Sequence, residues 1–124
     1  MGRWWGWRDT IQLLRKCGVT DASGTSTTGD QGADVLFSFG KVRVVVQAKR
    51  HTATVGNKAI QEVHAAKGFY KCDKAWVVTN STFTTSAKTL ARQLDVLLLD
   101  GADLLRFNSK FEEYFANLKV PAES

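Results

Sequence analysis

The sequence contains few cysteines, few histidines and no long apolar run, and each shortage narrows the kinds of protein that it can encode. Its two cysteines, Cys17 and Cys72, follow no secretory signal, so we expect reduced thiols in a cytoplasmic protein. The two histidines do not combine with these cysteines in zinc-ligand spacing, which argues against a structural zinc site. The longest apolar run, near 96–99, is far shorter than the about 18 residues of a membrane-spanning helix. The sequence is therefore typical of a globular protein without a membrane segment.

Acidic residues are missing from a long central stretch. Between Val35 and Gln61 there is no Asp or Glu. The same stretch contains five basic residues, Lys41, Arg43, Lys49, Arg50 and Lys58. Together with a net charge of +5 and a pI near 9.4, this distribution suits binding to a polyanion such as DNA. A solvated basic edge strand that prevents aggregation would give the same pattern, so the charges alone leave both explanations open.

The periodicity of apolar residues predicts one α/β domain over residues 1–124. With 44% apolar and 23% charged residues, a chain of this length can build a core without disulfides. After a first helix, residues 19–32 are rich in Thr, Ser, Gly and Asp and are expected to form a loop. The expected order is a helix (7–18), a hairpin (35–39 and 41–49), a helix (56–71), a strand (75–79), a helix (84–94), a strand (96–99) and a helix (101–118). An antiparallel pair followed by helix-connected strands predicts a mixed sheet in an α/β sandwich.

The hairpin brings together residue types that can hold a divalent metal. Gln47 and Lys49 point to the same side of their strand, because side chains alternate along a strand. A turn of two or four residues places Asp34 opposite Val45 and diagonal to Gln47 on that side, whereas a three-residue turn points it away. Carboxylate and amide oxygens, and the main-chain carbonyl of Ala48, are suitable ligands for Mg²⁺. Lys49 could then orient a water molecule or neutralise charge on a phosphate. Ordinary turn chemistry of an Asp in a loop is the competing explanation.

Several motifs in a fixed order resemble a known nuclease family. The runs Gly-Asp-Gln-Gly-Ala-Asp-Val at 29–35 and Val-Gln-Ala-Lys-Arg at 46–50 are followed by Val-Val-Thr-Asn at 77–80 and Leu-Asp-Gly at 99–101. Phe83, Ala87 and Leu104 continue the pattern, which covers about residues 7–105. In this order the motifs resemble the Mrr-like branch of the PD-(D/E)xK nuclease superfamily, where Gln commonly replaces an acidic residue of the second motif.

The resemblance implies a restriction-endonuclease-like fold, a three-layer sandwich whose mixed central sheet is flanked by helices. It also implies hydrolysis of DNA phosphodiesters that depends on Mg²⁺ or Mn²⁺. Carried over by position, Asp34 is the metal-binding aspartate, Gln47 its partner and Lys49 the catalytic lysine. Asp30 would support the loop or touch a second metal. Gln61 would be a polar site residue on the following helix.

Contacts to DNA are expected from basic residues of the central stretch, namely Lys41, Arg43, Arg50 and Lys58. A homodimer is expected as well, because one such site cuts one strand and a duplex cut needs two. The chain is expected to lack the separate DNA-reading domain that restriction enzymes of this family typically have.

One departure from the family pattern keeps other functions open. The first helix of the family usually has a Phe-Glu pair whose Glu joins the metal site, and Trp7-Arg8 stands at that place here. Asp9 is adjacent but is turned away by about 100° on a helix. With Arg8 for the Glu and a neutral Gln47, the site would have few carboxylates. The alternatives are a DNA-binding module that has lost catalysis and a structure-specific nuclease, such as a Holliday-junction resolvase.

Overall fold

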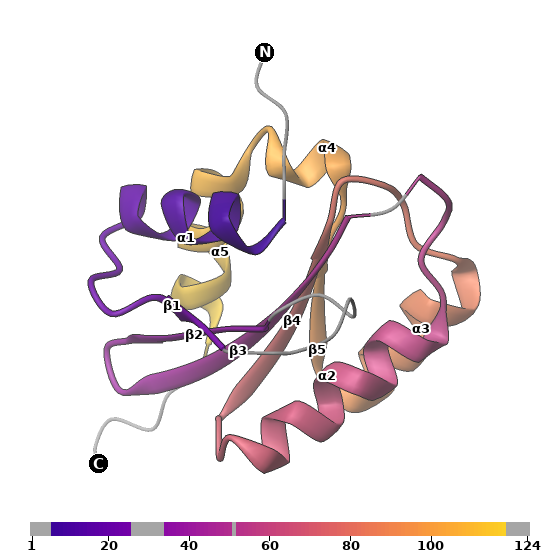
Figure 1. Cartoon of the computed structure of the whole chain (residues 1–124), viewed down its shortest axis with the longest axis horizontal. Helices are drawn as coiled ribbons and strands as arrows, with labels where there is room; N and C mark the ends of the chain where they lie inside the picture. The colour runs from indigo at the N-terminus through magenta and orange to yellow at the C-terminus, as the bar shows by residue number, and fades with distance from the viewer. Residues whose placement is uncertain (1–5, 26–33, 51, 119–124) are drawn as a thin grey trace.

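The protein is a three-layer α/β sandwich, seen edge-on in the computed structural model, which describes residues 6–25, 34–50 and 52–118 (Figure 1). The strands are β1 (Ser23–Gly24), β2 (Asp34–Phe39), β3 (Val42–Lys49), β4 (Lys74–Thr79) and β5 (Val96–Leu99). The helices are α1 (Trp7–Lys16), α2 (Asn57–Phe69), α3 (Thr85–Leu94), α4 (Gly101–Leu104) and α5 (Phe107–Asn117). Helices α2 and α3 cover one face of the sheet, and α1 and α5 cover the other (Figure 1). The predicted fold class is confirmed.

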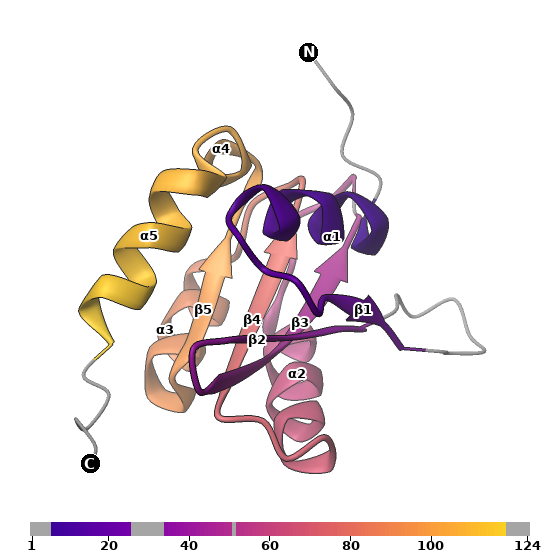
Figure 2. The same ribbon diagram turned by 90° about the vertical axis from the view of Figure 1, so that its left-hand side faces the viewer.

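The five strands form one mixed sheet in the order β1-β2-β3-β4-β5. Strands β1, β2 and β3 pair antiparallel, whereas β3, β4 and β5 run parallel. The arrowheads of β3, β4 and β5 therefore point to one edge of the sheet (Figure 2). Strands with this arrangement are covered on both faces by helices, and ligands bind at the carboxyl ends of such strands. We therefore expect the functional site at that edge of the sheet.

The core lies on both faces of the two central strands. Val46 and Trp76 face α1 and α5, while Val45 and Val77 face α2, and all four are fully buried. Trp76 is surrounded by the rings of Phe37, Phe107, Phe111, Tyr114 and Phe115, with centroids 5.2–6.5 Å away. Buried aromatic clusters of this kind supply much of the apolar area that stabilises a small domain.

Two elements differ from the sequence prediction. Residues 23–24, expected in a loop, form β1, because Ser23 and Gly24 pair with Leu36 and Val35 of β2. The expected helix over 101–118 is wrong as one unit, because it is divided into α4 and α5. The division lets α5 restart at Phe107, whose ring reaches the core.

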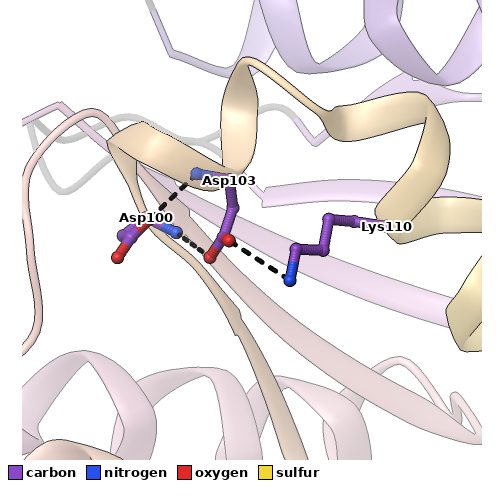
Figure 3. Close-up of polar contacts among 3 residues, drawn as sticks. All are labelled: Asp100, Asp103 and Lys110. Atoms are coloured by element: carbon purple, nitrogen blue, oxygen red, sulfur yellow. Dashed lines mark hydrogen bonds and ion pairs between the residues drawn. The ribbon is translucent and has the colours of Figure 1, made fainter.

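A polar cluster joins α4 to α5 (Figure 3). The Asp100 carboxylate accepts a hydrogen bond from the backbone N–H of Asp103 at 2.9 Å. Asp103 in turn accepts from the backbone N–H of Asp100 at 3.0 Å, which completes a capping box. The second oxygen of Asp103 lies 3.5 Å from Lys110 Nζ on α5. The cluster therefore fixes where α4 begins and how α5 leaves it.

Neither cysteine forms a disulfide. The Cys17 thiol donates to Asn108 Oδ1 at 3.0 Å, and burial raises the pKa of Cys17 to about 11. Within residues 6–25, 34–50 and 52–118, no helix combines the length and the apolar character required to cross a bilayer.

Gly24 is expected to be essential for the packing of α1 on β1. A Cβ atom at this position would lie 2.7 Å from two ring carbons of Trp7, which is closer than real Cβ atoms approach other atoms. Gly24→Ala should therefore lower the free energy of unfolding by about 1–3 kcal/mol, measured by urea denaturation. Gly68→Ala on α2 is the matched control, because nothing lies within 4 Å of its added methyl group. The control should be as stable as the parent or more stable. Equal stability of Gly24→Ala and the parent would contradict this account.

Candidate active site

The β2–β3 hairpin places Asp34 and Gln47 directly opposite each other. A two-residue turn at Gly40 and Lys41 connects the paired residues Phe39 and Val42, and Gly40 has a positive φ of 63°. The resulting register pairs Asp34 with Gln47. The expected pairing of Asp34 with Val45 is therefore wrong by two residues, because the turn lies later than assumed. The expected shared face is retained, since a shift of two residues does not change it.

Asp34 is fixed at the start of β2 by the segment that follows β1. Its backbone N–H donates to Thr25 Oγ1 at 3.1 Å, and its carbonyl accepts from the backbone N–H of Thr25 at 2.8 Å. Across the hairpin, Gln47 is only 6% exposed. Lys49, two residues further along β3, lies beside Thr79 of the parallel strand β4. These residues meet at the carboxyl end of the central strands, as the motif spacing predicted.

A second carboxylate comes from α2. Glu62 Oε1 lies 3.2 Å from Lys49 Nζ, and the two side chains are 28% and 14% exposed. Ion pairs shielded to this degree are screened less by salt than surface pairs. Glu62 thus joins the site from the helix that follows β3.

The sequence prediction named Gln61 as the polar site residue of α2, whereas the α2 residue that lies beside Lys49 is Glu62. Asn57, Gln61 and His64 share a helix face as expected, but that face is exposed to solvent. Glu62 is rotated by about 100° from Gln61, which turns it toward the sheet beside the buried Val63. One signal was available, because Glu62 is the only acidic residue of α2.

Three oxygens of the site are buried without a hydrogen bond. Asp34 Oδ1 and Gln47 Oε1 have no hydrogen-bond partner among the described residues, and Glu62 Oε1 has only its ion pair with Lys49. Buried polar atoms are almost always hydrogen-bonded. Several buried oxygens without hydrogen bonds in one site therefore indicate that a ligand binds there. Two carboxylates and an amide oxygen are hard ligands of the type that Mg²⁺ and Mn²⁺ prefer. In the part of the chain that the structure describes, no three His, Cys, Asp or Glu residues lie close enough to hold a metal. A cation here would therefore need the Gln47 amide as well.

The surroundings of Asp34 oppose its ionisation. Burial raises the pKa of Asp34, and the negative charge of Glu62 raises it further, while the positive charge of Lys49 acts in the opposite direction. A buried pair of like charges favours protonation of one member unless a cation is present. The residues present thus fit a divalent metal ion.

The other expected residues are distributed unevenly around this site. Ala48 lies between Gln47 and Lys49 in β3, with a buried side chain. Arg50 is exposed directly after β3. Lys58 is exposed, with its Nζ 4.0 Å from Glu62 Oε2.

Two expected DNA contacts lie far from Lys49. Arg43 lies at the opposite end of β3, about 20 Å from Lys49 at a rise of about 3.3 Å per residue, and Lys41 lies in the turn beyond it. The structure therefore does not bring these two residues to the site. Asp30 lies outside the described residues, as does His51.

The first helix contributes no Glu at the family position. Arg8 is exposed, and its guanidinium carbon lies 5.1 Å from the centre of the Trp7 ring, in a cation–π contact. The carboxylate that the family usually has on this helix is thus absent, as the sequence indicated, while Glu62 on α2 brings one to the site.

Taken together, these features define a class of protein. The sheet is mixed, an Asp begins β2, a Gln-x-Lys motif ends β3, and the following helix adds a Glu. This combination is that of the restriction-endonuclease-like nuclease fold.

Comparison with known proteins identifies the family. A family model described as restriction endonuclease, the Mrr catalytic domain, matches residues 10–108. The chain belongs to this Mrr family. It is 34% identical over 100 residues to the type IV methyl-directed restriction enzyme EcoKMrr of Escherichia coli strain K12. That match covers 76% of this chain and 33% of the relative, so the chain spans about a third of that protein's length.

A solved structure has the same fold. The protein of unknown function AF1548 superposes with a TM-score of 0.60 over 74% of this chain and 54% of that chain. The sequence identity is 19%, so this similarity bears on the fold alone.

Proposed function

We propose that this chain is a metal-dependent endonuclease that hydrolyses phosphodiester bonds of DNA. The observation that supports this most directly is that two buried oxygens, Asp34 Oδ1 and Gln47 Oε1, have no hydrogen bond among the described residues and belong to the same site as the Lys49–Glu62 ion pair. A purely structural site would pair such atoms, because an unpaired buried polar group costs about 1–3 kcal/mol. Membership of the Mrr family provides the reaction class.

Each residue has a distinct role in this proposal. Asp34, Glu62 and Gln47 would hold Mg²⁺ or Mn²⁺ through their side-chain oxygens, and the Ala48 carbonyl would add a main-chain ligand. A divalent cation bound there would polarise the phosphate and lower the pKa of a water molecule. Lys49, positioned by Glu62, neutralises the charge that develops on the phosphate oxygens as water attacks.

The substrate contacts belong to the same proposal. Arg50 and Lys58 are close enough to the site to bind phosphates next to the scissile bond. Lys41 and Arg43 would contact the duplex further away, if DNA extends along β3. A homodimer would supply the two sites needed to cut both strands.

Two rival functions remain testable. A binding module without catalysis was suggested by Arg8 and Gln47, but Glu62 restores a second carboxylate and favours the nuclease. A structure-specific nuclease would share the same site and would cut four-way junctions in preference to linear duplex.

The test is nicking of supercoiled plasmid in Mg²⁺, Mn²⁺ or EDTA. The parent should convert the plasmid to open-circular or linear DNA only with metal. Lys49→Ala should reduce the rate about 100-fold, the effect typical of losing one group that stabilises transition-state charge. Lys16→Ala on α1, an exposed lysine, is the control and should cut at the parent rate. Cleavage in EDTA, or an unchanged rate for Lys49→Ala, would refute the mechanism. A gel shift without cleavage would favour the binding module.

A further inference from the structure

Phe69 is one of two large apolar side chains that the described part of the chain leaves almost fully exposed. It is 79% exposed, and the other, Leu105, is 82% exposed. Phe69 is the last residue of α2, and its ring meets the half-buried ring of Tyr70 edge-on, with centroids 4.9 Å apart. Nothing lies within 4 Å of a Cβ atom added at Gly68, the residue before it. The Phe69 ring is therefore held by one aromatic neighbour and is accessible to a ligand.

Basic side chains surround this end of α2. Lys67 lies in its last turn and Lys71 follows it, and neither forms an ion pair within the described ranges. Arg43, at the start of β3, is joined to the same segment. Its carbonyl accepts from the N–H of Asp73 at 2.8 Å, and its own N–H donates to the Asp73 carboxylate at 2.9 Å. Asp73 is the only acidic residue between positions 63 and 94, so positive charge is in excess around Phe69.

The backbone of Lys71 is in the left-handed conformation, with a φ of 57°. Lys71 follows Tyr70, the C-cap of α2, and glycine is preferred at this position because a Cβ atom is disfavoured there. A lysine here therefore lowers the stability of the fold, while its side chain is exposed to solvent. Strained backbone of this kind is concentrated at functional positions.

The end of α2 is less negative than a bare helix C-terminus. The carbonyls of residues 66–68 accept hydrogen bonds from the backbone N–H groups of residues 70–72 at 2.9–3.2 Å. These bonds and the charge of Lys67 offset the negative end of the helix dipole. An anion can therefore bind beside Phe69.

We propose that this end of the molecule is a second nucleic-acid site, which binds single-stranded DNA. One base stacks on the Phe69 ring, and the adjacent phosphates are held by Lys67, Lys71 and Arg43. Sites for single strands combine aromatic rings with basic side chains in this way. A duplex does not fit, because its bases are stacked on one another and offer no free face to the ring. The choice of DNA rests on the proposed function, in which DNA is the substrate.

This second site is separate from the candidate active site. Helix α2 runs from the edge where β3 ends to the opposite edge, where β4 begins (Figure 2). Arg43 lies about 20 Å from Lys49 along β3, at a rise of about 3.3 Å per residue. The two sites can therefore be changed independently of each other.

The test is binding of a fluorescent oligothymidylate of about 12 nucleotides, measured by anisotropy in EDTA so that no metal-dependent cleavage interferes. The parent should bind it, and unlabelled duplex of the same length should compete at least about tenfold less well than the single strand. Phe69→Ala should raise the dissociation constant about tenfold, the loss typical of one stacked base. Leu105→Ala is the matched control, because it removes an equally exposed apolar side chain elsewhere, and it should bind like the parent.

A second variant separates binding from folding. Lys71→Gly should raise the melting temperature, because glycine suits the left-handed backbone, and should nevertheless bind the oligothymidylate more weakly. The slope of log K against log salt concentration should fall in magnitude by about 0.7, the value for one phosphate contact of a single strand. Phe69→Ala should leave this slope unchanged. Lys88→Ala removes the same charge from an exposed position of α3 and should preserve both affinity and slope.

Three outcomes would overturn the proposal. The first is a parent that does not bind the oligothymidylate, and the second is binding that neither Phe69→Ala nor Lys71→Gly weakens. The third is competition by the duplex as strong as by the single strand, which would show that no base stacks on Phe69. Plasmid nicking is scored separately, so an inactive parent would refute the nuclease and leave the binding result intact.

Discussion

Asp34→Asn is expected to abolish metal-dependent cleavage of DNA and at the same time to stabilise the fold. The substitution keeps the shape of the side chain but removes one of the two carboxylates that face the site. If the cation supplies several kcal/mol of transition-state stabilisation, its loss reduces the cleavage rate about 1,000-fold or more. Plasmid nicking at a fixed Mg²⁺ concentration measures this effect.

The expected gain in stability follows from the raised pKa of Asp34. A carboxyl group whose pKa is higher in the folded than in the unfolded protein binds its proton more tightly in the folded state. The folded protein is therefore favoured at pH values below the ordinary pKa of Asp, and this advantage is lost as the pH rises through the folded pKa. Burial and the negative charge of Glu62 both oppose ionisation of Asp34 in the folded parent, and Asn removes this cost.

An Asn at position 34 also supplies a hydrogen-bond donor to a site that has unpaired acceptors. Its amide can donate to Gln47 Oε1, which has no hydrogen bond among the described residues of the parent. One such bond contributes about 1 kcal/mol, or roughly 3–6 °C in melting temperature for a domain of this size.

Melting curves of the parent and Asp34→Asn, recorded between pH 3 and pH 8 in EDTA, test whether the substitution raises or lowers the stability of the fold. The advantage of the variant should be smallest near pH 3 and should grow as the pH rises above the ordinary Asp pKa of about 3.8. Asp21→Asn is a suitable control at a residue outside the site and should show no such growth. An Asp34→Asn protein that is less stable than the parent at pH 8 would contradict the claim that the folded protein disfavours the charge of Asp34.

Local chemistry was sufficient to predict most of the hairpin. Strand alternation alone placed Gln47 and Lys49 on one side, and Gly40 marked the turn that returns the chain to Asp34. The predicted partner of Asp34 on β3 was wrong by two residues, because Gly40 can be either the first or the second residue of a tight turn. Only the pairing of Phe39 with Val42 selects between these possibilities, and that pairing depends on packing.

The residues that could not be predicted are those whose position depends on contacts between elements. Strand β1 has two residues, too few for a periodic pattern, and exists because Gly24 can lie against Trp7. Gln61 and Glu62 are neighbours in sequence, and only the rotation of α2 on the sheet decides which of them faces Lys49. That rotation is set by Ile60 and Val63, which are fully buried.

Glu62 also bears on whether Arg8 prevents catalysis. In the sequence, Arg8 stands where the family usually has a Glu of the metal site, and this made a loss of catalysis a reasonable alternative. In the folded chain, α2 presents a carboxylate to the same lysine, 3.2 Å away, so the site has two carboxylates without α1. Arg8 is then free of a role at the metal, and Arg8→Ala should leave the cleavage rate within a few-fold of the parent.

Glu62→Gln is expected to have an effect as large as that of Asp34→Asn. Under the proposed function it removes a metal ligand and the carboxylate that positions Lys49, so cleavage should fall about 1,000-fold at a Mg²⁺ concentration that just saturates the parent. Gln61→Ala, one residue away on the exposed face of α2, should cut at the parent rate. Equal losses in both variants would indicate damage to the helix.

A second readout of Glu62→Gln does not depend on activity. Because Glu62 raises the pKa of Asp34 and Lys49 lowers it, removing the Glu62 charge should lower the pKa of Asp34 in the metal-free protein. Carbon-detected NMR titration of the Asp34 carboxyl group measures this shift. Isothermal titration with Mn²⁺ should show weaker binding in the same variant, because affinity for hard cations depends on the number of charged ligands. An unchanged Asp34 pKa together with unchanged Mn²⁺ affinity would mean that Glu62 only positions Lys49, and that the metal relies on β2 and β3 alone.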